Sequence, residues 1–135
     1  MNKGEIWLVD IPESGGHEQQ GARPVVLISE LEANIAMIIP CTSNMKALRF
    51  PHVLELEPNK KNGLSSFSVA LIFQLRAIDK KRLIKKIGTI DSDQLITVDE
   101  TIKSMLKLNG KKLQPEKGVN RAELARLIYL LQNLD

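Results

Sequence analysis

The stretch from Gly15 to Val26, G-G-H-E-Q-Q-G-A-R-P-V-V, joins a polar loop to the start of an apolar run. Arg23 is a permanently charged, planar donor that can hold a phosphate through two parallel hydrogen bonds. Glu18 can accept a proton if burial or hydrogen bonding raises its pKa. Binding and catalytic groups commonly lie on loops that a rigid sheet holds in place. We therefore expect this loop to form half of a site that handles a phosphodiester.

The other half is expected from Pro40-Cys41-Thr42-Ser43, because a hydroxyl of Thr42 or Ser43 could donate a further hydrogen bond to the phosphate. Together these groups would suit cleavage of RNA by its own 2'-hydroxyl. In that reaction a base takes the hydroxyl proton, cations stabilise the phosphorane, and an acid protonates the departing 5'-oxygen. The route requires no metal ion, and the sequence predicts no cofactor.

The histidines and the cysteine are weaker candidates. His17 changes its charge near neutral pH and is a second-rank acid or base, and His52 ranks below it because a lone loop histidine is usually solvated. Cys41 is the single cysteine, so it cannot form an intramolecular disulfide. A small buried residue is favoured for Cys41 over a catalytic thiol, because free cysteine is among the most buried residue types.

Short β-prone runs are expected to position these groups. The predicted strands are Glu5–Ile11, Val25–Ser29 with Pro24 at its start, Ile35–Ile39 ending at Pro40, His52–Glu57, Ser68–Phe73, and Leu83–Ile87 closed by Gly88. A single helical turn is expected at 79–82. Because no helices separate the strands, the pattern predicts a small antiparallel β-barrel.

Two helices are predicted after the strands. The first opens with a capping box at Asp91 and Gln94, presents an apolar face that ends at Met105 or Leu106, and ends at Gly110. The second opens at Asn120. Its apolar stripe, which is favoured to pack within its own domain over contacting a partner, comprises Leu124, Leu127, Ile128, Leu131 and Leu134.

The composition predicts a cytoplasmic protein with one folded core and no membrane contact. Hydrophobic residues make up 43% of the 135 residues and charged residues 26%, and the N-terminus lacks the pattern of a signal peptide. Residues 1–68 hold six Lys/Arg against eight Asp/Glu, whereas residues 69–135 hold thirteen against eight. The basic run at 80–86 indicates either contact with a polyanion or a solvated surface strand.

Several motifs in order resemble one known family. They are K-G-E-I-W-L-V-D-I-P, G-x-E-Q-x-G-x-R-P-V-V-L-I-S, I-I-P-C-T-S, S-x-x-x-x-F-Q-L-R-A-I-D-K-x-R-L and I-G-x-I. This order resembles the MazF/PemK (Kid) toxin endoribonucleases. The resemblance implies an SH3-like antiparallel β-barrel with a C-terminal helix, a homodimer, and metal-independent cleavage of single-stranded RNA at short sequences. It implies 2',3'-cyclic phosphate and 5'-hydroxyl ends, and a cognate antitoxin that occupies the RNA groove.

The resemblance also implies roles for individual residues. Arg23 matches the transition-state arginine, Thr42 the donor at the scissile phosphate, and Glu18 the acidic residue proposed as a base. RNA contacts are expected from Gly16, His17, Gln19, Ser43, Gln74 and Arg76. The Kid branch has an arginine and an aspartate where this chain has the apolar stretch 71–73, which favours a mechanism based on Arg23 and Thr42.

The domain prediction has three parts: a toxin-like domain over 1–110, a linker over 111–118, and an additional helix over 119–135 that the resemblance leaves unexplained. Two alternatives to the endoribonuclease remain open from the sequence. One is a non-catalytic, CcdB-like module that binds a protein such as DNA gyrase, and the other is an inactive relative that acts as a regulator. Retention of Arg23 and Thr42 favours the nuclease.

Overall fold

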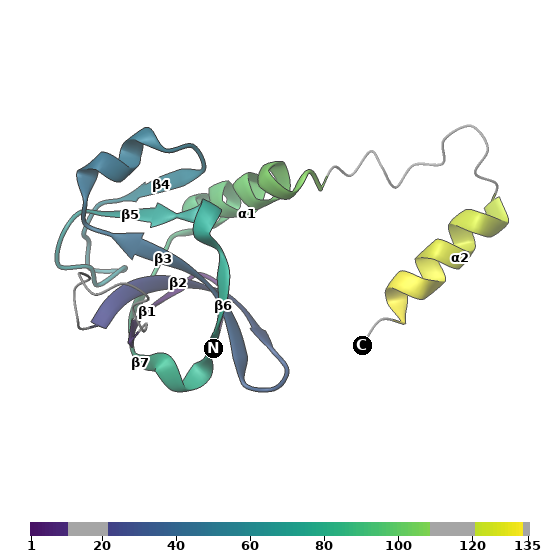
Figure 1. Ribbon diagram of the computed structural model, residues 1–135, viewed down its shortest axis with the longest axis horizontal. Coiled ribbons are helices and arrows are strands. Elements are labelled where there is room, and N and C mark those ends of the chain that lie inside the picture. Colours follow the sequence, from purple (N-terminus) through teal and green to yellow (C-terminus); the bar gives the residue numbers. More distant parts are fainter. Residues whose placement is uncertain (11–21, 109–120, 134–135) are drawn as a thin grey trace, which may run out of the picture.

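The computed structural model describes residues 1–10, 22–108 and 121–133, and these form a mainly antiparallel β structure followed by helices (Figure 1). The strands are β1 (Glu5–Asp10), β2 (Ala22–Leu31), β3 (Ile35–Thr42), β4 (Val53–Leu56), β5 (Ser68–Leu71), β6 (Arg76–Asp79) and β7 (Leu83–Thr89). The helices are α1 (Ser92–Leu106) and α2 (Arg121–Gln132), with short 3-10 helices η1 (Met45–Arg49), η2 (Ile72–Gln74) and η3 (Lys80–Arg82).

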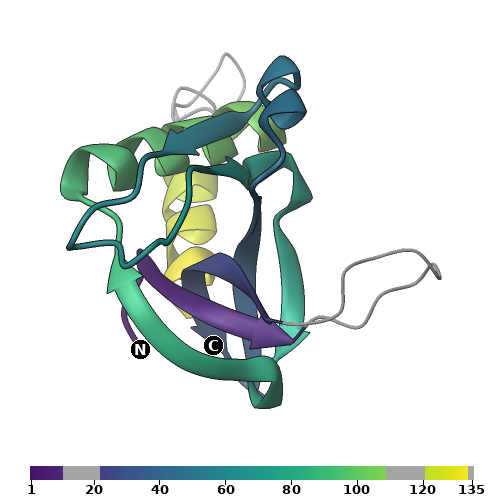
Figure 2. The same cartoon turned by 90° about the vertical axis from the view of Figure 1, so that its left-hand side faces the viewer.

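The strands form one twisted sheet in the order β4-β5-β3-β2-β1-β7, and β6 pairs with β3 beside this path. All the pairings are antiparallel. In the turned view, β1 and β7 curve across the front while α1 lies across the top (Figure 2). The predicted class, mainly antiparallel β with C-terminal helices, is confirmed. Among the described residues, no pairing between β4 and β7 closes the sheet into a barrel.

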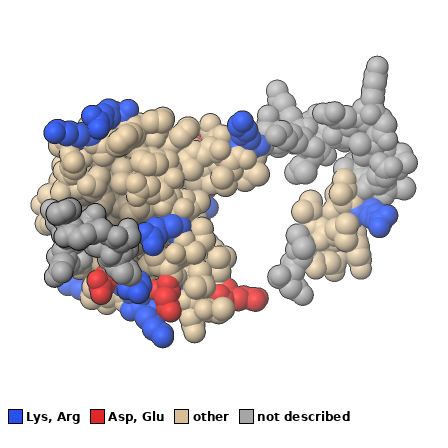
Figure 3. All heavy atoms as spheres, viewed as in Figure 1, with Lys and Arg blue, Asp and Glu red and all other residues tan. Residues whose placement is uncertain are grey.

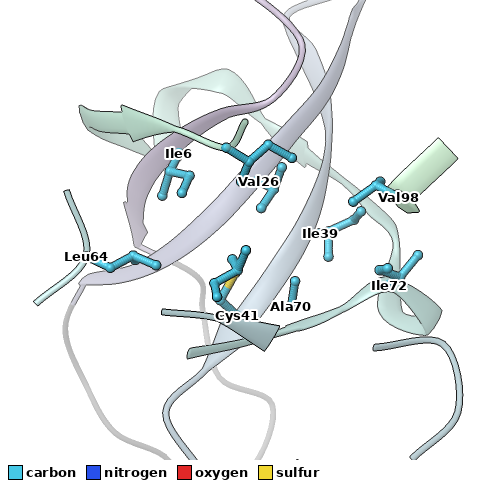
Figure 4. Packing of buried hydrophobic residues seen from close by; sticks show 10 residues of the cluster. Ile6, Val26, Ile39, Cys41, Leu64, Ala70, Ile72 and Val98 are labelled. Atoms are coloured by element: carbon cyan, nitrogen blue, oxygen red, sulfur yellow. The ribbon is translucent and has the colours of Figure 1, made fainter. Parts of the chain in front are cut away.

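Both faces of the central strands are buried, because successive side chains of a strand point to opposite faces. Val26 and Ile39 belong to one buried cluster, whereas Val25 and Ile38 belong to the other. Val98 of α1 is fully buried and joins the first cluster beside Ile39 and Ile72 (Figure 4). The helix therefore covers one face of the sheet, and the ends of β2 and β3 rest on a packed base.

The prediction that the third strand stops at Pro40 is wrong, because β3 continues to Thr42. On one side, Pro40 pairs with Val25 of β2. On its other side, β3 changes partners, from β6 up to Ile38 to β5 from Cys41 onward. A proline is tolerated where a strand does not need its missing amide donor, and this change of partner provides such a position.

Other element boundaries also differ from the expectations. Strand β5 ends at Leu71 and the chain turns into η2, and neither β6 nor η1 was predicted. The turn expected at 79–82 is confirmed as η3, with Asp79 as its N-cap. Gly88 lies within β7 rather than after it. A Cβ at this position would fall 2.3 Å from the Asn62 backbone carbon, which explains why the residue is glycine. The glycine allows a loop to approach, and it does not end the strand.

The start of α1 is confirmed and its predicted end is wrong. Asp91 and Gln94 form the reciprocal capping box, but the helix ends at Leu106 with Lys107 in the left-handed conformation at φ 58°. The expected Gly110 cap lies outside the described residues. Helix α2 is present, and its Leu127, Ile128 and Leu131 side chains are about half exposed rather than packed. None of the helices in the described ranges is long and apolar enough to cross a membrane.

Glu5 forms a buried polar anchor between β1 and β7. Its carboxylate accepts a hydrogen bond from Trp7 Nε1 at 3.0 Å and lies 3.2 Å from Lys86 Nζ. Burial by itself would raise the pKa of Glu5, but the hydrogen bonds from Trp7, the Asn2 backbone and Lys86 together outweigh it and lower the pKa. The ionised carboxylate therefore stabilises the fold.

We expect Glu5→Gln to lower the free energy of unfolding at neutral pH by about 1–2 kcal/mol, because it removes a charged acceptor from a buried site. The carboxylate's contribution is fully present above pH 4.5, its ordinary pKa, and is lost as the pH falls through the lower pKa of the folded state. Urea unfolding at several pH values should therefore show the difference from wild type shrinking in acid. Glu100→Gln, on an exposed position of α1, is the matched control and should show no such trend. A pH-independent difference for Glu5→Gln would contradict the linkage.

Candidate active site

A pocket of about 660 Å³ opens where β2 begins and β3 ends. Strands β1 and β7 form one wall, and the loop between β4 and β5 forms another. The lining residues are Leu8, Ala22, Arg23, Pro24, Cys41, Thr42, Ser43, Asn44, Gly63, Leu64, Ser65, Ser66, Ser68, Lys85 and Ile87. Arg23 and Pro24, at the described end of the first predicted half, and Cys41, Thr42 and Ser43 of the second thus line one pocket.

Arg23 lies inside β2, opposite Val9 of β1, so the strand begins earlier than the predicted Val25–Ser29 with Pro24 at its start. On the other side, Val25 pairs with Pro40 of β3. Arg23 precedes Val25 on β2 and Thr42 follows Pro40 on β3, and both residues line the pocket. A strand holds a side chain more rigidly than a loop, so the guanidinium is better placed for a fixed role than expected.

Thr42 ends β3, and a backbone hydrogen bond holds its hydroxyl in position. The Asn44 amide donates to Thr42 Oγ1 at 3.1 Å, and Asn44 in turn caps η1 by accepting from the Lys46 amide. Accepting one hydrogen bond does not use the hydroxyl hydrogen, so Thr42 can still donate to a ligand. The side chain is half-buried, which limits its rotation.

The structure adds residues to the pocket that motif reasoning missed. Lys85 of β7 supplies a second cation, and the loop before β5 supplies the hydroxyls of Ser65 and Ser66. No carboxylate is found among the lining residues in the described part of the chain. Hydroxyls with two cations and no described acid suit a phosphate group. The basic run at 80–86 was the signal for Lys85, but only the pairing of β7 with β1 places it here.

The other predicted site residues fall into two groups. Ser43 lines the pocket, whereas Gln74 and Arg76, both exposed, lie at the junction of η2 and β6, outside the pocket lining. Gly16, His17, Glu18 and Gln19 lie outside the described residues. His52 is exposed next to β4, away from the pocket.

Cys41 is a buried structural residue, as predicted. Its side chain is 3% exposed and points into the core cluster near Ala70 and Leu64 (Figure 4). Burial raises the pKa of its thiol to about 12, so the thiolate that a nucleophile requires is scarce at neutral pH. In the part of the chain described, no three His, Cys, Asp or Glu residues gather as metal ligands.

The antiparallel sheet, with a cationic, hydroxyl-rich pocket at its strand ends, defines a small protein suited to binding a phosphodiester. The chain belongs to the PemK-like, MazF-like toxins of type II toxin-antitoxin systems, because the model of this family matches residues 2–106. It is 33% identical over 114 residues to the Endoribonuclease MazF of Staphylococcus epidermidis, covering 82% of this chain and 94% of that protein.

Solved structures show the same fold. The MazE-MazF crystal structure from Deinococcus radiodurans matches with a TM-score of 0.66 at 24% identity, covering 81% of this chain and 97% of that chain. The Mycobacterium tuberculosis toxin MazF-mt6 matches with a TM-score of 0.61 at 18% identity, covering 78% and 98%. The resemblance seen in the sequence is therefore confirmed, and the family assignment supports the nuclease interpretation over the gyrase-binding one.

Proposed function

We propose that this protein is a sequence-specific, metal-independent endoribonuclease that cuts single-stranded RNA through attack of the 2'-hydroxyl. The observation that carries the proposal is the pocket that Arg23, Thr42 and Lys85 line together. Electrostatic stabilisation of charge that develops in the transition state is commonly the largest contribution to catalysis. A rigid pocket with two cations and several hydroxyls can provide it for a phosphorane.

In the proposed reaction, the 2'-oxygen attacks the neighbouring phosphorus, forming the O2'–P bond while the P–O5' bond breaks. A base removes the 2'-hydroxyl proton, and we assign this role to Glu18 from its motif. Arg23 grips two non-bridging oxygens as negative charge grows on them. It also assists protonation of the 5'-oxygen, which takes its proton from solvent, and Glu18 returns the 2'-hydroxyl proton to solvent. Thr42 donates a hydrogen bond to the same phosphate. The products would be a 2',3'-cyclic phosphate and a 5'-hydroxyl, with no net consumption of water.

The test is to incubate the purified protein in excess EDTA with long single-stranded RNAs that together contain every short sequence. Mass spectrometry of the products should show discrete cuts with cyclic phosphate ends and 5'-hydroxyl ends. Intact RNA across the whole set would overturn the proposal. Cleavage only after a divalent ion is restored would overturn its metal-independent part.

We expect Thr42→Val to slow cleavage about 100-fold, because it removes a donor aimed at the scissile phosphate while keeping the side-chain shape. Thr42→Ser retains the hydroxyl and should keep most of the activity. Thr97→Val removes a hydroxyl that bonds the Asp93 carbonyl on α1, away from the pocket, and is the matched control. Single-turnover rates on one defined RNA measure the effect. Equal rates for Thr42→Val and Thr97→Val would remove Thr42 from the mechanism.

The cellular setting is also part of the proposal. We expect a cytoplasmic homodimer in which a second subunit completes the RNA groove, an SH3-like closure of the sheet, and inhibition by a cognate antitoxin. Support for the antitoxin comes from relatives: the matched Deinococcus radiodurans structure is a MazE-MazF complex, and a mycobacterial endoribonuclease of the same fold was solved with its cognate antitoxin. The positive balance of residues 69–135 supports RNA as the substrate.

We further propose that the toxin domain spans 1–110, that 111–118 is a linker, and that the added helix serves a partner contact. Deleting residues after Gly110 should leave cleavage unchanged, because every described pocket residue precedes it. The half-exposed apolar side chains of α2 should instead contribute to antitoxin binding, so the truncated chain should lose affinity for the antitoxin while remaining a dimer. Titration with the antitoxin measures the first effect and light scattering measures the second. Unchanged stability, dimerisation and antitoxin affinity in the truncated chain would remove this role.

A further inference from the structure

Two phenylalanine rings form an exposed pair outside the pocket. The ring centroids of Phe50 and Phe73 lie 5.5 Å apart with the planes tilted by 56°, and these residues are 44% and 39% exposed. The Arg49 guanidinium carbon lies 5.3 Å from the centroid of the Phe50 ring. The chain has only three phenylalanines, so placing two of them at one exposed point requires an explanation beyond core packing.

Backbone hydrogen bonds hold the main chain at both phenylalanines. The Phe50 amide donates to the Ala47 carbonyl at 3.1 Å, and the Phe73 amide donates to the His52 carbonyl at 3.3 Å. His52, between η1 and β4, has a left-handed backbone with φ 61°, which is uncommon for a residue other than glycine. Because the main chain is held at both positions and the two rings contact each other, a ligand that stacks on the pair would lose less of its binding energy to ordering these rings.

The aromatic pair is connected to the pocket by η1. This helix begins directly after Asn44, a pocket residue, and its five residues span on the order of 10 Å. It carries Lys46 and Arg49 and no acidic residue. A further cation, Arg76, comes three residues after Phe73 in the sequence, at the start of β6. Figure 3 shows blue side chains over η1 at the upper left with no red beside them. A polyanion bound at the pocket could therefore continue along a basic surface to the rings.

We propose that the Phe50–Phe73 pair, with Arg49, is a stacking platform for an unpaired base of the RNA, next to the nucleotides that react in the pocket. This inference rests on the proposed function. Proteins hold single-stranded RNA by stacking bases on aromatic rings and arginine planes beside a basic groove. A symmetric contact between two copies through this patch would instead bring Lys46 and Arg49 of one copy toward their equivalents, and like charges oppose such a contact.

The test uses an RNA that the wild-type protein cleaves, made uncleavable by a 2'-deoxy nucleotide at the cut, with each flanking base removed in turn to leave an abasic site. Fluorescence anisotropy measures binding to Phe50→Leu, Phe73→Leu and wild type. Tyr129→Leu, which removes an exposed aromatic ring from α2, is the matched control. We expect either phenylalanine variant to bind about tenfold more weakly, and the control to bind like wild type.

The abasic series separates stacking from a general structural effect. One abasic position should weaken wild-type binding about as much as Phe73→Leu does, and it should weaken Phe73→Leu little further, because both changes remove the same contact. Additive losses at every position, unchanged binding, or a loss of dimer seen by light scattering would each overturn the platform. If the wild type cuts RNA while the leucine variants bind and cut like it, only this inference fails. If the wild type cuts no RNA, the proposed function fails as well.

Discussion

Replacing Arg23 by alanine is expected to slow RNA cleavage by about 10²–10³-fold, the largest loss among the pocket substitutions. The reason is geometric as well as electrostatic. Arg23 belongs to β2, between β1 and β3, and lines the same pocket as Thr42. Its planar fork can follow two phosphate oxygens as charge accumulates on them, which a more distant cation cannot do. Single-turnover cleavage of one defined RNA is the measurement.

Two further variants separate the effect of the paired hydrogen-bond donors of Arg23 from the effect of its positive charge. Arg23→Lys keeps the positive charge but loses the paired donors, so it should remain well below wild type, by about tenfold or more. Arg126→Ala removes the same residue type from an exposed position of α2 and should cleave like wild type. Thermal unfolding of all three must remain cooperative for the comparison to count. A rate for Arg23→Ala within about twofold of wild type would rule out the proposed role.

The sequence predicted those elements whose signals are local. Short apolar, β-prone runs placed the central strands, and the pair Asp91 and Gln94 placed the start of α1, because strand burial and helix capping depend on residues a few positions apart. Pro40 was misread as a strand end for the same reason. Its missing amide is harmless only because β3 changes partners there, and no local pattern records that change.

The site was predicted in part, with similar limits. Arg23 and Thr42 were found from their residue types and from the family motifs, and the sheet brings them to one pocket. Lys85 was not singled out, since five cations at 80–86 look alike until the pairing of Leu8 with Lys85 turns one of them toward the pocket. Phe73 was read as part of an apolar strand, whereas η2 carries its ring to the surface beside Phe50. Long-range pairing thus decides which residues of a motif reach the pocket or the surface.

Pocket shape should also depend on Gly63, and its replacement by alanine is expected to cost about 3 kcal/mol or more of unfolding free energy. Gly63 has a φ of 67°, and an added Cβ would lie 1.9 Å from the Ile87 carbonyl oxygen of β7. That neighbour is backbone, so no side-chain rotation can relieve the overlap. Asn62 fixes the same loop, with its buried side chain accepting from the Asn59 and Leu64 amides.

Gly4→Ala is the matched control, because Gly4 also has a positive φ, 92°, yet a Cβ there would meet only side-chain atoms at 3.4 Å or farther. It should therefore show only the backbone cost of about 1 kcal/mol. Since Gly63, Leu64 and Ser65 line the pocket, Gly63→Ala should also weaken RNA cleavage in the fraction that remains folded, whereas Gly4→Ala should not. Urea unfolding and cleavage rates on the same samples measure both effects. Equal destabilisation by the two substitutions would show that the loop around Gly63 moves to relieve the overlap and does not fix the pocket wall.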